Sequence, residues 1–208
     1  MNEDKKIFHI KSDINIMENS FTLPKKYNFE NKIKFLFIVG PHFRFIHKNI
    51  SDFSKAMTSL SALQVDFEIN ITVSKEELEN SSQWNNSLNT RTNFIGYVYN
   101  KNEIRNLFSD NTILISTSII ETLGLHVIEA VKNGILVISP NQPYSRSVYG
   151  ESMLKYNLFN TDSLIEIIFK LINGDINQSN YIIQLQNDIK KSENSKYKKI
   201  SEVFKEVI

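Results

Sequence analysis

Short apolar runs rich in β-branched residues alternate with segments of helical periodicity along most of this sequence. The apolar runs have the length of buried strands, and they occupy residues 33–39, 67–73, 93–97, 112–117, 135–139 and 153–156. Strands that alternate with helices predict βαβ units, and therefore a parallel sheet with helices on both faces. We expect a single α/β domain built on one doubly wound parallel sheet.

Local signals place the helices between these strands. Asn49 or Ser51 can cap a helix that runs to about residue 63, and Ser74 with Glu77 forms a capping box for a short one. Thr161 is the expected cap of a helix that ends near residue 173. These signals divide the chain into a linker-like entry segment (1–31), a Rossmann-like domain (32–175) and C-terminal helices (176–208). We expect two helices in the C-terminal region, over 176–191 and 196–207.

Composition excludes several classes of function. The 208 residues carry 24 Lys plus Arg and 23 Asp plus Glu, and the resulting net charge of +1 argues against a general nucleic-acid binder. The sequence contains no cysteine, which rules out disulfides, thiolate nucleophiles and cysteine metal sites. The N-terminus lacks the pattern of a secretory signal, and no apolar run approaches the length of a membrane span. We expect a cytoplasmic protein.

The loop after the fourth strand carries the most informative residues. Glu121 lies in the loop, Gly124 lies at the expected start of the next helix, and Glu129 lies about one and a half turns into that helix. A helix start offers free N–H groups to an anion, and carboxylates accept hydrogen bonds from sugar hydroxyls. A ligand with both phosphate and hydroxyls, such as a nucleotide-sugar, fits this arrangement.

The same segment resembles the signature of a known enzyme family. Its residues run Glu121-Thr122-Leu123-Gly124-Leu125-His126-Val127-Ile128-Glu129-Ala130, and Asn133-Gly134 follow before the next strand. This pattern is similar to that of the group 1 (family 4) glycosyltransferases, which are retaining, metal-independent enzymes of the GT-B fold. The resemblance covers about residues 14–172 and implies the C-terminal, donor-binding half of such an enzyme.

The resemblance also implies roles for individual residues. Glu121 is expected to be the catalytic residue and to contact the donor sugar's hydroxyls, and Glu129 is expected to contact the ribose diol. Lys48, helped by Arg44, would pair with phosphate. The remaining expected donor-binding residues line the base or face the diphosphate and sugar; they are Tyr97, Val98, Thr122, Leu123, Gly124 and Leu125. No metal or other cofactor is implied, and the donor would be of the UDP or GDP type.

Three departures from the family pattern stand out. Pro41 occupies the position where the family usually has an Arg, so Arg44 or His42 is the candidate substitute. The loop after the fifth strand (141–146) lacks the family's Gly. Tyr144, Arg146 and Tyr149 are open between closing over the donor and packing. We expect this segment to correspond to the second domain without the N-terminal acceptor domain, which leaves open a fragment, a split enzyme with a separate acceptor-domain subunit, or a truncated gene product.

Function and partners follow from the resemblance. We expect a retaining, hexosyltransferase-like glycosyltransferase that uses a saccharide or lipid-linked saccharide acceptor in bacterial surface polysaccharide synthesis. The alternative is a non-catalytic nucleotide-sugar-binding or scaffolding module. A sugar-nucleotide epimerase ranks last, because those enzymes lack this glutamate-containing setting. An amphipathic stripe in 196–208 would pack on this domain, on a separate half, or peripherally on the inner face of the membrane.

Overall fold

The computed structural model describes residues 10–11, 20–40, 46–121, 124–193 and 198–199. Six parallel strands form the central sheet; they are β2 (Ile33–Phe37), β3 (Phe67–Ile71), β4 (Thr92–Phe94), β5 (Thr112–Ile115), β6 (Leu136–Pro140) and β7 (Leu154–Tyr156). They lie in the order β4-β3-β2-β5-β6-β7. The prediction of an α/β fold with a Rossmann-like parallel sheet is confirmed.

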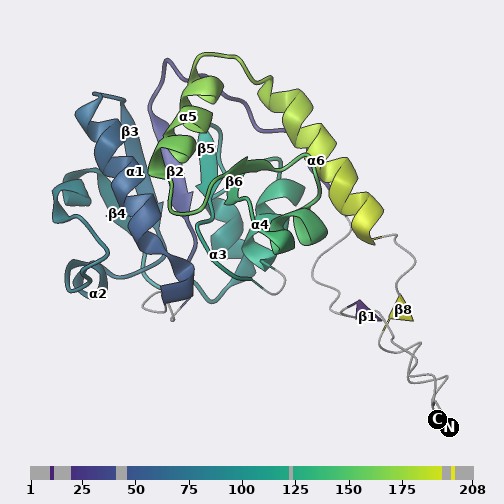
Figure 1. Cartoon of the computed structure of the whole chain (residues 1–208), viewed down its shortest axis with the longest axis horizontal. Coiled ribbons are helices and arrows are strands. Elements are labelled where there is room, and N and C mark those ends of the chain that lie inside the picture. The colour runs from purple at the N-terminus through teal and green to yellow at the C-terminus, as the bar shows by residue number, and fades with distance from the viewer. Residues whose placement is uncertain (1–9, 12–19, 41–45, 122–123, 194–197, 200–208) are drawn as a thin grey trace, which may run out of the picture.

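The central strands are buried because helices cover both faces of the sheet. Every residue of β5 and β6 is buried, as their uninterrupted apolar sequences require. The α-helices are α1 (Ile50–Ala62), α2 (Lys75–Glu79), α3 (Lys101–Asn106), α4 (Leu125–Lys132), α5 (Thr161–Ile172) and α6 (Gln178–Glu193). Helices α1 and α5 pack together on one face, and α6 packs on α4 (Figure 1).

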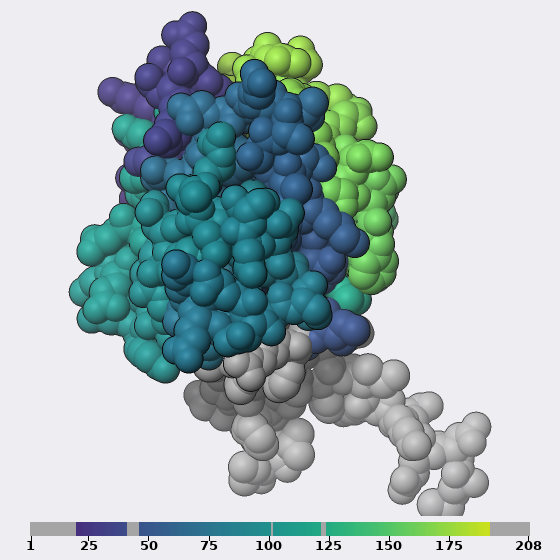
Figure 2. Space-filling view, turned by 90° about the vertical axis from the view of Figure 1, so that its left-hand side faces the viewer, coloured from purple at the N-terminus to yellow at the C-terminus, as the bar shows by residue number. Residues whose placement is uncertain are grey.

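Strand β4 forms one edge of the sheet. A 3₁₀ segment, η2 (Asn86–Arg91), leads into β4 and packs on α1, β3 and β4. Figure 2 faces this side and shows the blue-green segments between β3 and α3 as one continuous surface.

Several helix ends differ from the predicted ones. Asn49 precedes α1 as expected, but its side chain makes no capping bond. Ser74 caps α2, accepting a hydrogen bond from the Glu77 amide, so this prediction is confirmed. The cap of α5 is Asn160, whose Oδ1 accepts from the Ser163 amide, whereas Thr161 was predicted. The side chain of Asn accepts this bond as well as that of Thr, so the pattern left one residue of ambiguity.

The C-terminal stretch is only partly helical. Helix α6 fills most of the predicted 176–191 helix. Lys198–Lys199 instead form a short strand, β8, paired in parallel with β1 (Ile10–Lys11), so the helix predicted over 196–207 is wrong at these two residues. The rest of that segment, with its amphipathic stripe, lies outside the described residues.

Residues 20–31 of the entry segment run along the edge of the sheet where the strands begin (Figure 1). The Thr22 amide donates to the Lys132 carbonyl, and the Lys25 amide donates to the Gly134 carbonyl. Tyr27 bridges two strands, because its hydroxyl donates to the Thr112 carbonyl at 2.9 Å and accepts from the Leu136 amide at 2.7 Å. This part of the entry segment is therefore fixed to the domain.

We predict that Tyr27→Phe lowers the free energy of unfolding by about 2 kcal/mol, because two hydrogen bonds worth about 1 kcal/mol each are lost. Urea denaturation followed by circular dichroism measures the change. Tyr99→Phe is the matched control, since Tyr99 is 84% exposed and should lose almost nothing. Equal midpoints for the two variants would show that the Tyr27 hydroxyl does not brace the sheet.

Candidate functional site

The loops after β2 and β5 meet at the carboxyl edge of the sheet. In this strand order β2 and β5 are neighbours whose following helices depart in different directions, and such switch points hold the ligand in open α/β sheets. A 3₁₀ turn, η1 (Ile46–Lys48), leads into α1. The Thr117 hydroxyl donates to the Lys48 carbonyl, and the Ile119 amide donates to the His47 carbonyl at 2.7 Å. These bonds hold the two loops together.

Lys48 and Glu121 form the central ion pair of this edge. The Lys48 Nζ donates to Glu121 Oε1 at 2.5 Å, and the Ser118 hydroxyl donates to the same oxygen at 2.8 Å. The pair is largely shielded from solvent, with 22% of the lysine side chain and 11% of the glutamate side chain exposed. Because water screens such a pair little, its charges act strongly on any group that enters.

Electrostatics keeps Glu121 ionised. Burial raises the pKa of its carboxyl, but the hydrogen bond from Lys48, the nearby His126 and the hydrogen bond from Ser118 lower it, so the pKa lies below the ordinary value. An ionised carboxylate can only accept hydrogen bonds. Glu121 is therefore suited to receive hydroxyl donors.

Helix α4 starts beside this pair. Its N-cap, Gly124, adopts the left-handed conformation (φ 51°) and supplies no capping side chain. The N–H groups of a first turn have no partner within the helix, and the helix dipole makes this end attractive to an anion. Leu125, the first residue of α4, is 37% exposed. Glu129 lies further along α4 and is buried, with 8% of the residue exposed.

Two tyrosines from the segment after β6 close the other side of Gly124. A π-helical turn, η3 (Ser145–Tyr149), follows Tyr144. The Tyr144 hydroxyl donates to the Ser118 carbonyl at 2.5 Å, and its ring packs edge-on against Tyr149 at 6.0 Å between centroids. Burial raises the pKa of Tyr144 to about 12. These aromatic residues, left open between function and packing, are packed beneath the loop that carries Glu121.

The other predicted donor-binding residues are placed unevenly. Lys48, Glu121 and Gly124 lie at the same edge of the sheet, whereas Arg44, Thr122 and Leu123 lie outside the described residues. Tyr97 and Val98 are half-buried in the segment after β4. The Tyr97 hydroxyl donates to Glu77 Oε1 at 2.8 Å, so it is engaged with α2.

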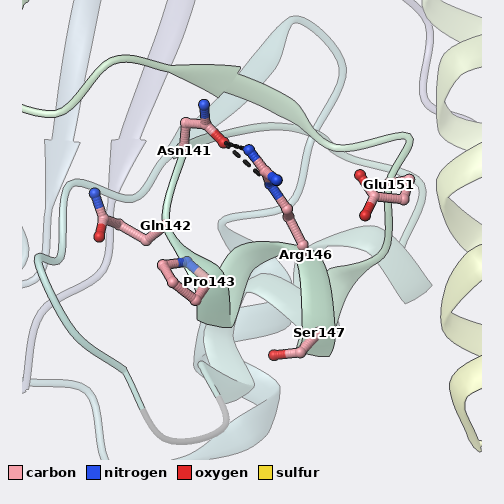
Figure 3. Close-up of a pocket in the computed structure, with 6 residues that line it drawn as sticks. All are labelled: Asn141, Gln142, Pro143, Arg146, Ser147 and Glu151. Atoms are coloured by element: carbon pink, nitrogen blue, oxygen red, sulfur yellow. Dashed lines mark hydrogen bonds between the residues drawn. The ribbon is translucent and has the colours of Figure 1, made fainter.

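An open hollow lies next to η3. Its volume is about 490 Å³, and Asn141, Gln142, Pro143, Arg146, Ser147 and Glu151 line it. Figure 3 shows Arg146 held by Asn141, through a hydrogen bond of 2.9 Å from Nη2 to Oδ1. Four of its lining residues, Asn141, Gln142, Pro143 and Arg146, belong to the loop that departs from the family pattern.

Sequence reasoning missed the hydroxyl residues that support the ion pair. Ser118 binds the Glu121 carboxylate and Thr117 binds the backbone of Lys48. The signal was available, because a run of three hydroxyl residues (116–118) ends a buried strand. Polar residues at that place in a parallel sheet point toward the ligand-binding edge.

Comparison with known proteins decides the family. The profile of the family described as "Glycosyl transferases group 1" matches residues 19–194. The chain belongs to the group 1 glycosyltransferases. A search of curated protein sequences finds no match.

Solved structures of glycosyltransferases share the fold of this group 1 domain. TarM is 19% identical with a TM-score of 0.61, covering 89% of this chain and 36% of its own. The catalytic domain of cholesterol-α-glucosyltransferase from Helicobacter pylori is 18% identical with a TM-score of 0.60, covering 79% of this chain and 99% of its own. The lipopolysaccharide outer core galactosyltransferase WaaB is 16% identical with a TM-score of 0.60, covering 86% of this chain and 53% of its own. The chain therefore spans about a third to a half of TarM and WaaB.

Two further features concern the described part of this glycosyltransferase domain. None of its helices there combines the length and hydropathy that a bilayer crossing requires. Within the same ranges, no three His, Asp or Glu side chains gather into a cluster that could hold a metal ion.

We predict that Gly124→Ala destabilises the domain more than Gly174→Ala. Both glycines have positive φ, and an L-residue there costs about 1–2 kcal/mol. A Cβ on Gly124 would also lie 1.7 Å from the Tyr149 hydroxyl, whereas a Cβ on Gly174 would meet nothing within 4 Å. Thermal denaturation compares the two variants, and equal losses would contradict the close contact.

A second prediction concerns acid stability. Burial lowers the pKa of His126 to about 4 and outweighs the negative charge of Glu121, which raises this pKa. The positive charge of Lys48 lowers it further. The imidazole of His126 gains its proton near pH 6.5 in the unfolded chain and near pH 4 in the folded chain. The stability that depends on its neutral form is therefore complete above pH 6.5 and is lost as the pH falls toward 4. The slope is at most about 1.4 kcal/mol per pH unit.

His126→Asn removes this titration, so its stability should fall less than that of the parent between pH 7 and pH 5. Urea midpoints at the two pH values measure how much stability each protein loses. The effect of the carboxylates cancels when the two losses are compared, because both proteins contain them. If parent and variant lose the same stability, His126 is not held neutral in the fold.

Proposed function

We propose that this chain binds a nucleotide-sugar at the carboxyl edge of its sheet and serves as the donor-binding part of a retaining glycosyltransferase. The observation that supports this most is the shielded Lys48–Glu121 pair beside the start of α4. A cation and a helix start suit a diphosphate, and an ionised carboxylate suits sugar hydroxyls. A nucleotide-sugar carries both groups next to each other.

Binding would exchange the partners of the ion pair. Lys48 now donates to Glu121, so an arriving diphosphate competes for the ammonium group. Glu121 then becomes free to accept from the sugar hydroxyls, while Ser118 keeps its carboxylate oriented. Glu129 would accept from the ribose diol. Tyr97 would face the base with its ring, since its hydroxyl is held by Glu77.

The same groups would favour bond cleavage. Negative charge grows on the diphosphate as the bond to the sugar breaks, and Lys48 with the first turn of α4 would stabilise that charge. The resemblance implies that the leaving phosphate accepts the acceptor's proton on the same face of the sugar. This domain then needs no side-chain base, and the reaction would proceed with retention and without a metal ion.

Structural neighbours support the choice of ligand and acceptor. A mutant of S. aureus TarM was solved in complex with fondaparinux, alpha-GlcNAc-glycerol and UDP, at 19% identity and a TM-score of 0.61. WaaB is a lipopolysaccharide outer core galactosyltransferase. We propose a UDP or GDP donor, a saccharide or lipid-linked acceptor, and a role in bacterial surface polysaccharide synthesis at the cytoplasmic side of the membrane.

The second candidate is a non-catalytic nucleotide-sugar-binding module. The observation that favours it is the shielded Lys48–Glu121 pair itself, which would bind a nucleotide-sugar whether or not transfer follows. Incubation with UDP- or GDP-sugars, a supplied acceptor domain and acceptor separates the two. Product formation supports the enzyme, and donor binding without product supports the module.

We predict that Lys48→Ala weakens binding of the UDP- or GDP-sugar by about ten- to a hundredfold, because a charge-assisted contact worth about 1.5–3 kcal/mol is lost. Glu129→Ala should also weaken binding through loss of the ribose contact. Isothermal calorimetry measures both. Lys170→Ala is the matched control, because Lys170 also pairs with a glutamate, Glu166, but on the exposed surface of α5. Parent-like affinity of Lys48→Ala would refute the phosphate role.

A further inference from the structure

Three buried polar side-chain atoms in the described ranges lack a hydrogen-bond partner, namely Asn49 Nδ2, Ser116 Oγ and the Tyr149 hydroxyl. All three belong to segments at the carboxyl edge of the sheet: Asn49 precedes α1, Ser116 follows β5, and Tyr149 ends the turn after β6. Buried polar atoms in folded proteins almost always have partners. Their concentration at this one edge suggests that part of the hydrogen bonding is completed by a ligand.

Tyr149 is the member of this group with the clearest position. The residue is fully buried, at 0% exposure. Its hydroxyl lies against Gly124, so closely that a Cβ on that glycine would come within 1.7 Å of the oxygen. Gly124 is the N-cap of α4 and provides no side chain to the first turn. The hydroxyl therefore reaches the helix start at the place where a capping side chain is missing.

The surroundings of Tyr149 hold the ring rigidly. Tyr144 packs against it edge-on, with 88° between the planes. Behind it, Gly150 (φ 98°) presses on α6, where a Cβ would lie 2.4 Å from Asp188 Cβ, and the Asp188 carboxylate accepts from the Ser152 amide. A side chain fixed in this way makes a hydrogen bond without further loss of conformational entropy.

The protonation state of Tyr149 decides what its hydroxyl can do. Burial raises the pKa of this phenol far above neutrality, aided by Tyr144 and by the negative charge of Glu121. The hydroxyl is therefore protonated and can donate. The positive end of the α4 dipole favours an anion at this position.

We propose that Tyr149 is a ligand-positioning residue whose hydroxyl donates a hydrogen bond to an anionic phosphoryl oxygen held at the start of α4. The inference rests on the proposed function, since the natural ligand there would be the diphosphate of the nucleotide-sugar. It adds a side-chain donor, contributed by the segment after β6, to the backbone amides and Lys48. The diphosphate would then be bound from both sides of Gly124.

Tyr149→Phe tests this proposal, and Tyr181→Phe is its matched control. Tyr181 is also a buried tyrosine, but its hydroxyl donates to the Val137 carbonyl at 2.8 Å and accepts from the Leu154 amide at 3.1 Å. Calorimetric titrations of the full chain with UDP, GDP and inorganic pyrophosphate give affinities, and thermal denaturation without ligand gives stability. Both variants delete one oxygen from the interior.

We expect Tyr149→Phe to weaken binding of the diphosphates by about tenfold while its melting temperature stays at or above that of the parent, since no bond within the protein is lost. Tyr181→Phe should melt lower and bind as the parent does. A purely structural role for the Tyr149 hydroxyl would give the reverse result, with lower stability and unchanged affinity, and would overturn the proposal.

The probes separate this inference from the proposed function. Nucleotides that bind equally well to parent and Tyr149→Phe overturn the role of Tyr149 alone. Pyrophosphate binding that depends on Tyr149, with no advantage for UDP or GDP, supports the role of Tyr149 but contradicts nucleotide-sugar binding. If the parent binds none of the three probes, both proposals fail.

Discussion

The position of β2 next to β5 is the constraint on which the rest of the site depends. All six strands are parallel, so every loop that follows a strand emerges at one edge, but only at this junction do the following helices diverge. The divergence allows η1 and the loop after β5 to approach each other and to exchange backbone bonds. The Lys48–Glu121 pair is the chemical result, because it joins residues 73 positions apart in the chain.

The sequence predicted six strands in a parallel sheet. Short, uninterrupted apolar runs are typical of strands that are buried on both faces, and such strands occur mainly in parallel sheets. It was less informative where a short-range preference had two solutions, as at the cap of α5, where Asn160 and Thr161 have nearly equal propensity. It also could not anticipate β8, because a two-residue strand depends entirely on its partner β1. Helical periodicity is a local property, and strand pairing is not.

At the candidate site, the pattern around Glu121 and Gly124 predicted that these residues lie at the carboxyl edge of the sheet, but spacing alone could not reveal which side chains meet there. The bond from Ser118 and the approach of Tyr149 to Gly124 depend on how the turn after β6 folds under the loop after β5. Tyr97 illustrates the opposite case, since its hydroxyl is occupied by Glu77 on α2. Whether a polar group is available to a ligand is a tertiary property.

The bracing of the sheet by Tyr27 has a practical consequence. Residues 20–31 run along the edge where the strands begin, which is the far side of the domain from Lys48 and Glu121. Leu23 in this segment is 86% exposed. A cysteine introduced there would be the sole thiol of the chain, so a dye or a sensor surface could be attached in a defined orientation with the Lys48–Glu121 edge facing the solution.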